Sequence, residues 1–164
     1  MEAIIDWLRA EGFSRGLPDK NSTWRSLKRR SDKWHEEIPR RQEKAKENAV
    51  WESLLGEMTI GGLKIKPLVT GQDLYNEGRE MRHCVSSYTG QCLHGGCRVF
   101  SLVEADGTRS TLSLLHRTAG GFVIGQHKGQ ANGPVSPAAA KAAWEVCRLY
   151  TLKHLEAAKT EAAD

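Results

Sequence analysis

Long hydrophobic runs are missing from this 164-residue sequence, which nowhere contains the roughly 18 consecutive apolar residues needed to span a bilayer. The first twelve residues carry acidic side chains where a secretory signal carries basic ones. Hydrophobic residues make up 39% and charged residues 27%, which excludes composition-driven disorder and allows a buried core. We therefore expect a soluble, cytoplasmic protein of one domain with a helical appendage and no membrane partner.

Cysteine is scarce, with four residues at positions 84, 92, 97 and 147. Intracellular thiols stay reduced, so we expect no disulfide framework of the kind found in small secreted domains. Cys84, Cys92, His94 and Cys97 offer the nitrogen and sulfur ligands that zinc prefers. Their spacing does not form two Cys-x-x-Cys halves, and a glycine-rich loop with incidental thiols also explains it. We predict no metal and no cofactor, with zinc at these four residues as the alternative.

Basic residues are concentrated near the N-terminus. Residues 14–48 hold eleven basic and six acidic side chains, whereas the rest of the chain is nearly balanced. Five residues of this segment recur with a helical period and share one face: Trp24, Leu27, Ser31, Trp34 and Ile38. We expect this helix to end or kink at Pro39 and a second helix to run from about residue 40 to residue 55. Residues 1–56 are thus predicted to form a basic helical segment.

The basic segment is a candidate nucleic-acid interface, with Trp24 and Trp34 anchoring it to the rest of the protein. The residues expected to contact phosphates are Arg25, Lys28, Arg29, Arg40 and Arg41. Binding of this kind weakens steeply as the salt concentration rises. A solvated helical face that binds nothing is the alternative interpretation.

After residue 57 the pattern changes from helical to extended. Residues 58–60 and 63–68 alternate around Gly61-Gly62, which is typical of a β-hairpin. A helical stripe runs from Leu74 to Tyr88, as one helix or as two helices broken near Gly78. Further expected elements are short strands at 98–104, 109–115 and 121–126 and a helix from Ser136-Pro137 to about Ala158, with Ala140, Trp144, Cys147, Thr151 and Leu155 on one face.

These elements predict an α+β fold. It comprises N-terminal helices, a hairpin plus a three-stranded antiparallel meander, a helix carrying a His-Cys motif and a C-terminal helix. Residues 57–164 are assigned to this α+β domain.

The His-Cys motif lies at residues 81–88. A thiol becomes reactive when a neighbouring base or cation lowers its pKa. Adjacent helical residues point about 100° apart, so His83 is a poor base for Cys84, and His116 or His127 would be needed instead. The alternative is structural: Cys84 is a small core residue and His83 is hydrogen-bonded.

A second candidate is the loop that begins at Gln126. Gly129 and Gly133 allow a close approach of the backbone, Lys128 supplies a cation, and a helix N-terminus follows. Together these features favour a cradle for phosphate or carboxylate. An ordinary polar turn, in which Asn132-Gly133 adopts the left-handed conformation, is the alternative.

Four motifs occur in order along the chain: Glu77-Gly78-x-x-Met81-x-His83-Cys84-Val85-x-x-Tyr88, Arg98-Val99-Phe100-Ser101-Leu102, Thr111-Leu112 and Gln126-x-Lys128-Gly129-x-x-Asn132. Together they resemble the PcfJ-like family, whose proteins occur on conjugative plasmids and other bacterial mobile elements. The resemblance covers about residues 57–150. It implies that the His-Cys pair, Tyr88 and the Gln126 loop form one site. One departure is Ser113, where the family commonly has glutamate, and this weakens an acid–base mechanism that would use that carboxylate.

The sequence leads to one favoured function and two alternatives. The favoured function is an accessory protein of a bacterial mobile element or conjugative plasmid that acts through nucleic-acid binding. One alternative is a small enzyme that uses His83 and Cys84 on a phosphate-containing substrate. The other is a protein–protein adaptor, for example an inhibitor of a host factor, whose partner belongs to a transfer or defence system. The candidate ligand-binding residues are Tyr88, Arg109, Gln126, Lys128 and Asn132.

Overall fold

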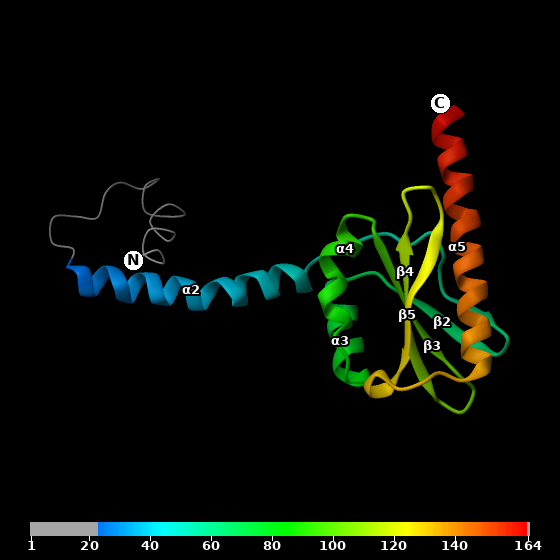
Figure 1. Cartoon of the computed structure of the whole chain (residues 1–164), viewed down its shortest axis with the longest axis horizontal. Helices are drawn as coiled ribbons and strands as arrows, with labels where there is room; N and C mark the ends of the chain where they lie inside the picture. The colour runs from blue at the N-terminus through cyan, green and yellow to red at the C-terminus, as the bar shows by residue number, and fades with distance from the viewer. Residues whose placement is uncertain (1–22, 164) are drawn as a thin grey trace. The chain divides into compact units, whose positions relative to one another are not determined.

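A computed structural model describes residues 23–163 and divides the chain into two units, Met1–Ala45 and Lys46–Asp164. The described part of the first unit belongs to helix α2 (Trp24–Glu47) (Figure 1). Thr23 caps this helix, because its hydroxyl oxygen accepts a hydrogen bond from the amide of Ser26 at 3.2 Å.

Helix α2 continues through Pro39, so the expected end at this residue is wrong, and so is a second helix reaching residue 55. Proline removes one backbone hydrogen bond, but the strong helix formers that follow it sustain the helix. The helix ends at Glu47 because the next residues bond elsewhere. Ala49 accepts from the amide of Gly71 at 2.8 Å, and Trp51 donates to Val69 at 2.9 Å.

Five strands form one antiparallel sheet in the order β1-β2-β3-β4-β5. They are β1 (Met58–Ile60), β2 (Leu63–Leu68), β3 (Cys97–Val103), β4 (Arg109–His116) and β5 (Phe122–Gly129). Ile60 pairs with Leu63 around Gly61 and Gly62, whose positive φ angles suit a two-residue hairpin turn. The predicted hairpin and meander are confirmed, and pairing of β2 with β3 joins them into a single sheet.

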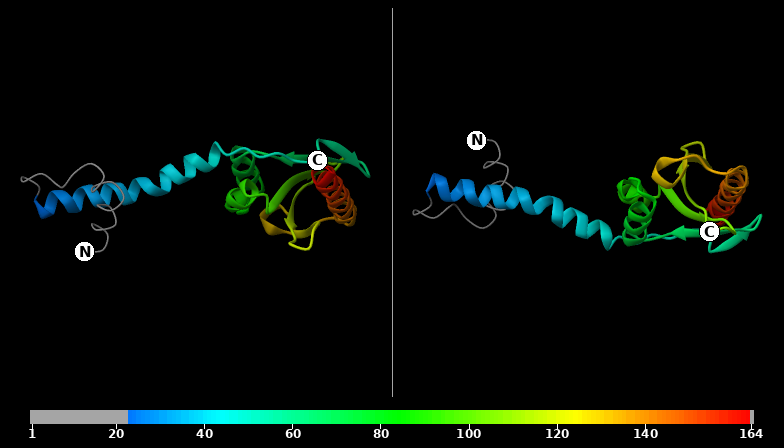
Figure 2. Two further views of the ribbon diagram at one scale, coloured as in Figure 1. Left: turned by 90° about the horizontal axis from the view of Figure 1, so that it is seen from above. Right: turned by 90° about the horizontal axis from the view of Figure 1, so that it is seen from below.

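Helices cover both faces of the sheet. Helices α3 (Gly71–Met81) and α4 (Thr89–Leu93) lie on one face and α5 (Pro137–Ala163) lies on the other, as Figure 2 shows. Successive side chains of each strand point to opposite faces of the sheet. Phe100, Leu102, Leu112 and Leu114 belong to the core on the α5 side, whereas Cys97 and Val99 belong to the core beside α3 and α4. The predicted α+β class is therefore confirmed.

The inward face of α5 differs from the predicted one. Its buried residues are Ala139, Ala142, Ala143, Val146, Cys147 and Tyr150, and of the expected stripe only Cys147 is among them. Trp144 is 69% exposed. The small alanine side chains let the helix lie close to the sheet, and this leaves the bulky indole at the rim. None of the helices within residues 23–163 combines the length and the apolar character required to cross a membrane.

Residues 46–56, directly before the hairpin, pack with the α+β domain, although they were predicted to belong to the basic segment. Trp51 is buried in the core beside α3, and its indole Nε1 donates to the carbonyl of Leu68 at 3.1 Å. Leu55 is buried in the core beside α5. The compact unit accordingly begins near Lys46.

Candidate functional site

His83 and Cys84, at the centre of the His-Cys motif, lie between two helices. Helix α3 is capped at its N-terminus by Thr70, whose hydroxyl oxygen accepts from the amide of Asp73 at 2.9 Å, and at its C-terminus by Arg82, which adopts φ 55°. His83 and Cys84 therefore precede the short 3-10 helix η2 (Val85–Tyr88). The helix is interrupted at Arg82. Gly78, where the interruption was expected, lies inside α3.

Gly78 has a different role from the expected helix break. A Cβ at this position would lie 2.8 Å from the carbonyl oxygen of His83. The amide of His83 also donates to the carbonyl of Gly78 at 3.0 Å. The missing side chain thus lets the His-Cys connection fold back closely against α3.

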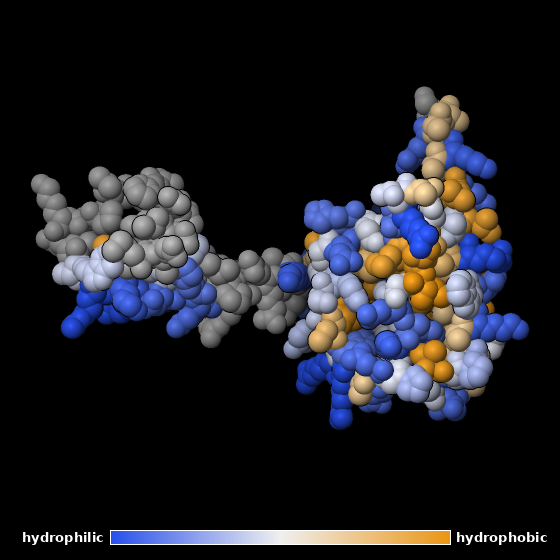
Figure 3. Space-filling model, viewed as in Figure 1, coloured by the Kyte–Doolittle hydropathy of each residue, from blue (hydrophilic) through white to orange (hydrophobic). Residues whose placement is uncertain are grey.

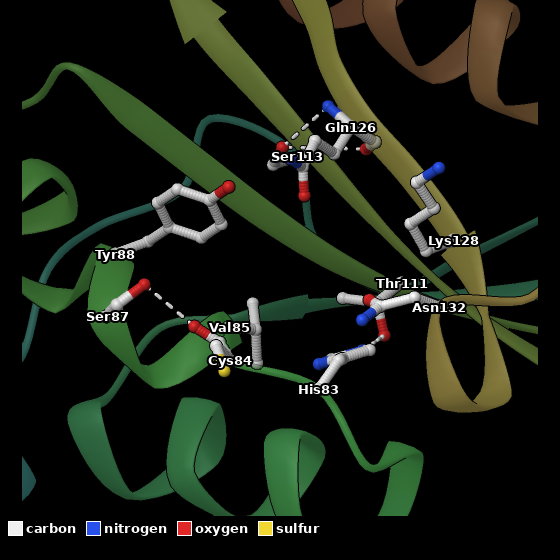
Figure 4. Close-up of a pocket in the computed structure, with 10 residues that line it drawn as sticks. All are labelled: His83, Cys84, Val85, Ser87, Tyr88, Thr111, Ser113, Gln126, Lys128 and Asn132. Carbon is white, nitrogen blue, oxygen red and sulfur yellow. Dashed lines mark hydrogen bonds between the residues drawn. The ribbon is translucent and has the colours of Figure 1, made fainter.

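A pocket of about 290 Å³ opens between this connection and the neighbouring face of the sheet (Figure 4). Ten residues line it: His83, Cys84, Val85, Ser87, Tyr88, Thr111, Ser113, Gln126, Lys128 and Asn132. The structure thereby brings together six of the seven residues expected to serve catalysis or ligand binding. They come from the connection, from the 3-10 helix η2, from β5 and from the 3-10 helix η3 (Gln130–Asn132), whereas Thr111 and Ser113 come from β4.

Arg109 is the predicted site residue that does not line the pocket. Its guanidinium forms ion pairs with Glu77 and Glu80 of α3. Its Nε donates to the hydroxyl oxygen of Ser101 at 2.9 Å. All of these contacts join the start of β4 to α3 and β3, so Arg109 belongs to the framework of the site.

Glu77 belongs to the first sequence motif, but it was not among the predicted site residues. Its side chain is fully buried on the inward face of α3, where it meets Arg109. Thr111 Oγ1 lies 2.6 Å from the second carboxylate oxygen and 2.9 Å from His83 Nε2. The sequence does indicate a buried acidic residue here, because Glu77 lies on the same helical face as the apolar Leu74 and Met81.

The position of Cys84 does not favour a thiol nucleophile. Cys84 is exposed, and Figure 4 shows its sulfur directed away from Ser113 and Gln126. Its carbonyl oxygen accepts from the hydroxyl of Ser87 at 2.7 Å. Within the described residues, no histidine forms a hydrogen bond with the thiol.

The two histidines considered as bases for Cys84 lie elsewhere. The His116 ring packs against Phe122 and His154, and His154 belongs to α5. His127 Nε2 lies 2.9 Å from the hydroxyl oxygen of Ser110, and burial lowers the pKa of His127. Neither residue lines the pocket.

The end of β5 places Lys128 on the pocket, and the following 3-10 helix η3 places Asn132 there. The amide of Gly129 donates to Gly133 at 2.9 Å, and a Cβ on Gly129 would lie 2.6 Å from the carbonyl oxygen of Pro134. Asn132 adopts φ 60°, as the polar-turn interpretation expected, but Gly133 is extended with φ −69°. The N-terminus of α5 is not part of the pocket lining, so the expected contribution of a helix N-terminus to the cradle is wrong.

The pocket is rich in hydrogen-bond donors and has no acidic lining. Of the described residues, none with a carboxylate lines it, whereas Lys128 and His83 do. Tyr88, Gln126 and Asn132 also line it, and across residues 23–163 their side chains form no hydrogen bonds to the protein. Such groups attract and orient an anion.

The three cysteines of the alternative zinc site differ in burial. Cys92 and Cys97 are buried together, and a hydrogen bond between the two thiols raises the pKa of Cys92 and lowers that of Cys97. Cys84, in contrast, is exposed. Residues 23–163 contain no group of three or more side chains of the kinds that bind metal ions and are placed to hold one.

Helix α2 presents an exposed basic surface. Arg25, Lys28, Arg29 and Lys33 surround a shallow depression together with Asp32 and Glu36. Figure 3 shows hydrophilic side chains along this part of the helix. Arg40 and Arg41 belong to α2, but their side chains lie outside the described ones. Trp24 is exposed and Trp34 is half-buried.

Comparison with known proteins identifies a family but no individual relative. No curated protein and no solved structure matches the chain. The model of the family described as "PcfJ-like protein" matches residues 11–141. This match includes α2, the complete sheet and every residue that lines the pocket, and it begins well before the region that carries the four sequence motifs. The chain belongs to the PcfJ-like family.

Proposed function

We propose that the pocket binds a phosphate-bearing ligand, and that the protein acts as an accessory protein of a bacterial plasmid or other mobile element. One observation carries the first part: the lining combines Lys128 and His83 with neutral polar side chains and contains no described acidic residue. Membership of the PcfJ-like family is consistent with the second part.

Charge and size both favour a small anion or the phosphate group of a larger ligand. Lys128 has no carboxylate partner within residues 23–163, so its ammonium group can pair with an incoming anion. Charge-assisted hydrogen bonds of this kind are about twice as strong as neutral ones. A volume of about 290 Å³ lies near the lower end of the range for small-molecule sites.

Lys128→Gln should weaken the binding of inorganic phosphate at least about tenfold, because a hydrogen bond to a charged group contributes about 1.5–3 kcal/mol. Binding would be measured by NMR titration of the full chain, with shifts expected for the amides of His83 and Lys128. Lys141→Gln is the matched control, because Lys141 is exposed on α5 across the sheet. Equal affinity in the two variants, or no phosphate binding at all, would contradict the proposal.

We also propose that α2 binds nucleic acid through its basic surface. The observation that favours this second function is the exposed group of Arg25, Lys28 and Arg29 on adjacent turns of one helix. Acidic side chains are interspersed, and Lys28 pairs with Asp32 at 2.9 Å. This exposed pair contributes little, so a phosphate can displace the carboxylate.

The triple variant R25Q/K28Q/R29Q should bind DNA or RNA more weakly than the wild-type chain. A plot of the logarithm of the association constant against the logarithm of the salt concentration has a negative slope. In the variant this slope should be less steep by up to ~3 than in the wild-type chain, since each phosphate contact on duplex DNA contributes about 0.9. Fluorescence anisotropy over a series of salt concentrations measures this slope. The variant K141Q/K153Q/K159Q changes the same number of charges on exposed α5 positions and should retain binding. Wild-type binding that is absent at low salt, or insensitive to salt, would refute this function.

A further inference from the structure

A line of hydrogen bonds runs from Arg109 through Glu77 and Thr111 to His83. Its first step determines the charge of Glu77, because the guanidinium of Arg109 stabilises the ionised form of this buried side chain. An ionised carboxylate has acceptor oxygens only. Thr111 is therefore the donor in its 2.6 Å contact with Glu77 Oε1.

The second step determines where His83 carries its hydrogen. The hydroxyl of Thr111 has one hydrogen, which is already donated to Glu77. In its 2.9 Å contact with His83 Nε2, Thr111 Oγ1 can then only accept. His83 Nε2 must carry a hydrogen, and in the neutral ring this leaves Nδ1 with a free lone pair.

We infer that His83 Nδ1 is the proton acceptor of the pocket, and that Glu77 and Thr111 are positioning residues that hold the ring in the Nε2–H form. The inference rests on the proposed phosphate site for its ligand. It adds an acid–base group to that site, because a water molecule or ligand hydroxyl beside the phosphate can transfer a proton to Nδ1. The hydrogen on Nε2 stays on the His83 ring and remains donated to Thr111 Oγ1 during this transfer.

The arrangement also explains how the ring tolerates the positive charge that proton transfer creates. The carboxylate of Glu77 lies at the far side of Thr111 and compensates that charge through the shared hydroxyl. A histidine oriented by a carboxylate is a recurring device in acid–base catalysis. Here the threonine hydroxyl lies between the two groups. The inference assigns the acid–base role to His83 alone, since Cys84 Sγ is directed away from the pocket residues on β4 and β5.

Long-range 1H–15N correlation NMR on the full chain, labelled at histidine and without added ligand, reports the hydrogen on each ring nitrogen. The variant H83N identifies the signals of His83. We expect the Nε2–H form in the wild-type chain and in Thr111→Ser, which keeps the hydroxyl. Thr111→Val removes the acceptor and should give a mixture of the two forms. A wild-type ring in the Nδ1–H form, or an unchanged ratio in Thr111→Val, would overturn the inference.

Glu77→Gln gives a sharper test, because it should reverse the direction of the hydrogen bonds. The amide oxygen of the new side chain is expected to face Arg109, so its NH2 group donates to Thr111. Thr111 then donates its own hydrogen to His83 Nε2, and the ring hydrogen moves to Nδ1. We expect the major form to change from Nε2–H to Nδ1–H. Retention of the Nε2–H form in a natively folded variant would overturn the inferred directions of these hydrogen bonds. These spectra need no phosphate, so their outcome is independent of the Lys128→Gln titration.

Discussion

Replacing Arg109 with methionine should lower the free energy of unfolding by about 3–5 kcal/mol, the typical cost of removing one partner from a buried ion pair. The carboxylate of Glu77 has no solvent exposure, and in the variant it would lose its only cationic partner among the described residues. Urea unfolding followed by circular dichroism measures the change.

Two further variants separate this effect from a general loss of surface charge. Glu80 pairs with the same guanidinium but is exposed, so Glu80→Gln should change the free energy of unfolding by less than about 1 kcal/mol. The double variant E77L/R109M replaces the pair with apolar side chains and should recover most of the lost stability. A double variant as unstable as R109M would show that the buried charge is not the cause.

Replacing Trp51 with alanine should lower the free energy of unfolding by about 3–5 kcal/mol, as large-to-small changes at buried aromatic residues do. Trp51 is 7% exposed and packs in the core beside α3, where it also donates to the carbonyl of Leu68. The same denaturation experiment measures the loss.

Trp144→Ala provides a matched control, because it makes the same chemical change at a side chain that is 69% exposed. Its expected effect is within about 0.5 kcal/mol, as for surface substitutions in general. Equal effects of the two substitutions would mean that residues 46–56 contribute nothing to the α+β domain. The expected difference would place the start of the folded domain before residue 51.

Local patterns predicted the sheet well and the helical segment less well. The hairpin could be read from alternation around Gly61-Gly62, because both signals lie within a few residues. The end of α2 could not, since the helix stops where Ala49 and Trp51 bond to the segment around Val69. No local rule indicates such a partner. The inward face of α5 was also misjudged, because alanines decide it through close packing against the sheet.

The sequence motifs predicted most of the residues that line the pocket, but they did not predict the residues that support it. Motif resemblance placed His83, Tyr88 and the Gln126 loop together, although these residues come from two segments that β3 and β4 separate in the chain. The role of Arg109 was misread as ligand binding because its partner Glu77 lies 32 residues earlier in the chain. A buried ion pair becomes visible only once α3 is placed against β4. The same holds for Thr111, which looks like an ordinary strand residue in the sequence.

The strand order also has a kinetic consequence. Each strand pairs with the next one along the chain, so most of the sheet can form through contacts that are close in sequence. Chains with local contacts lose less entropy on closing their loops and fold faster than chains with distant strand pairing. The pairing of β2 with β3 is the exception, because it must close the loop that contains α3, η2 and α4. We therefore expect the segment that carries His83 to be ordered at the step that limits the rate of folding.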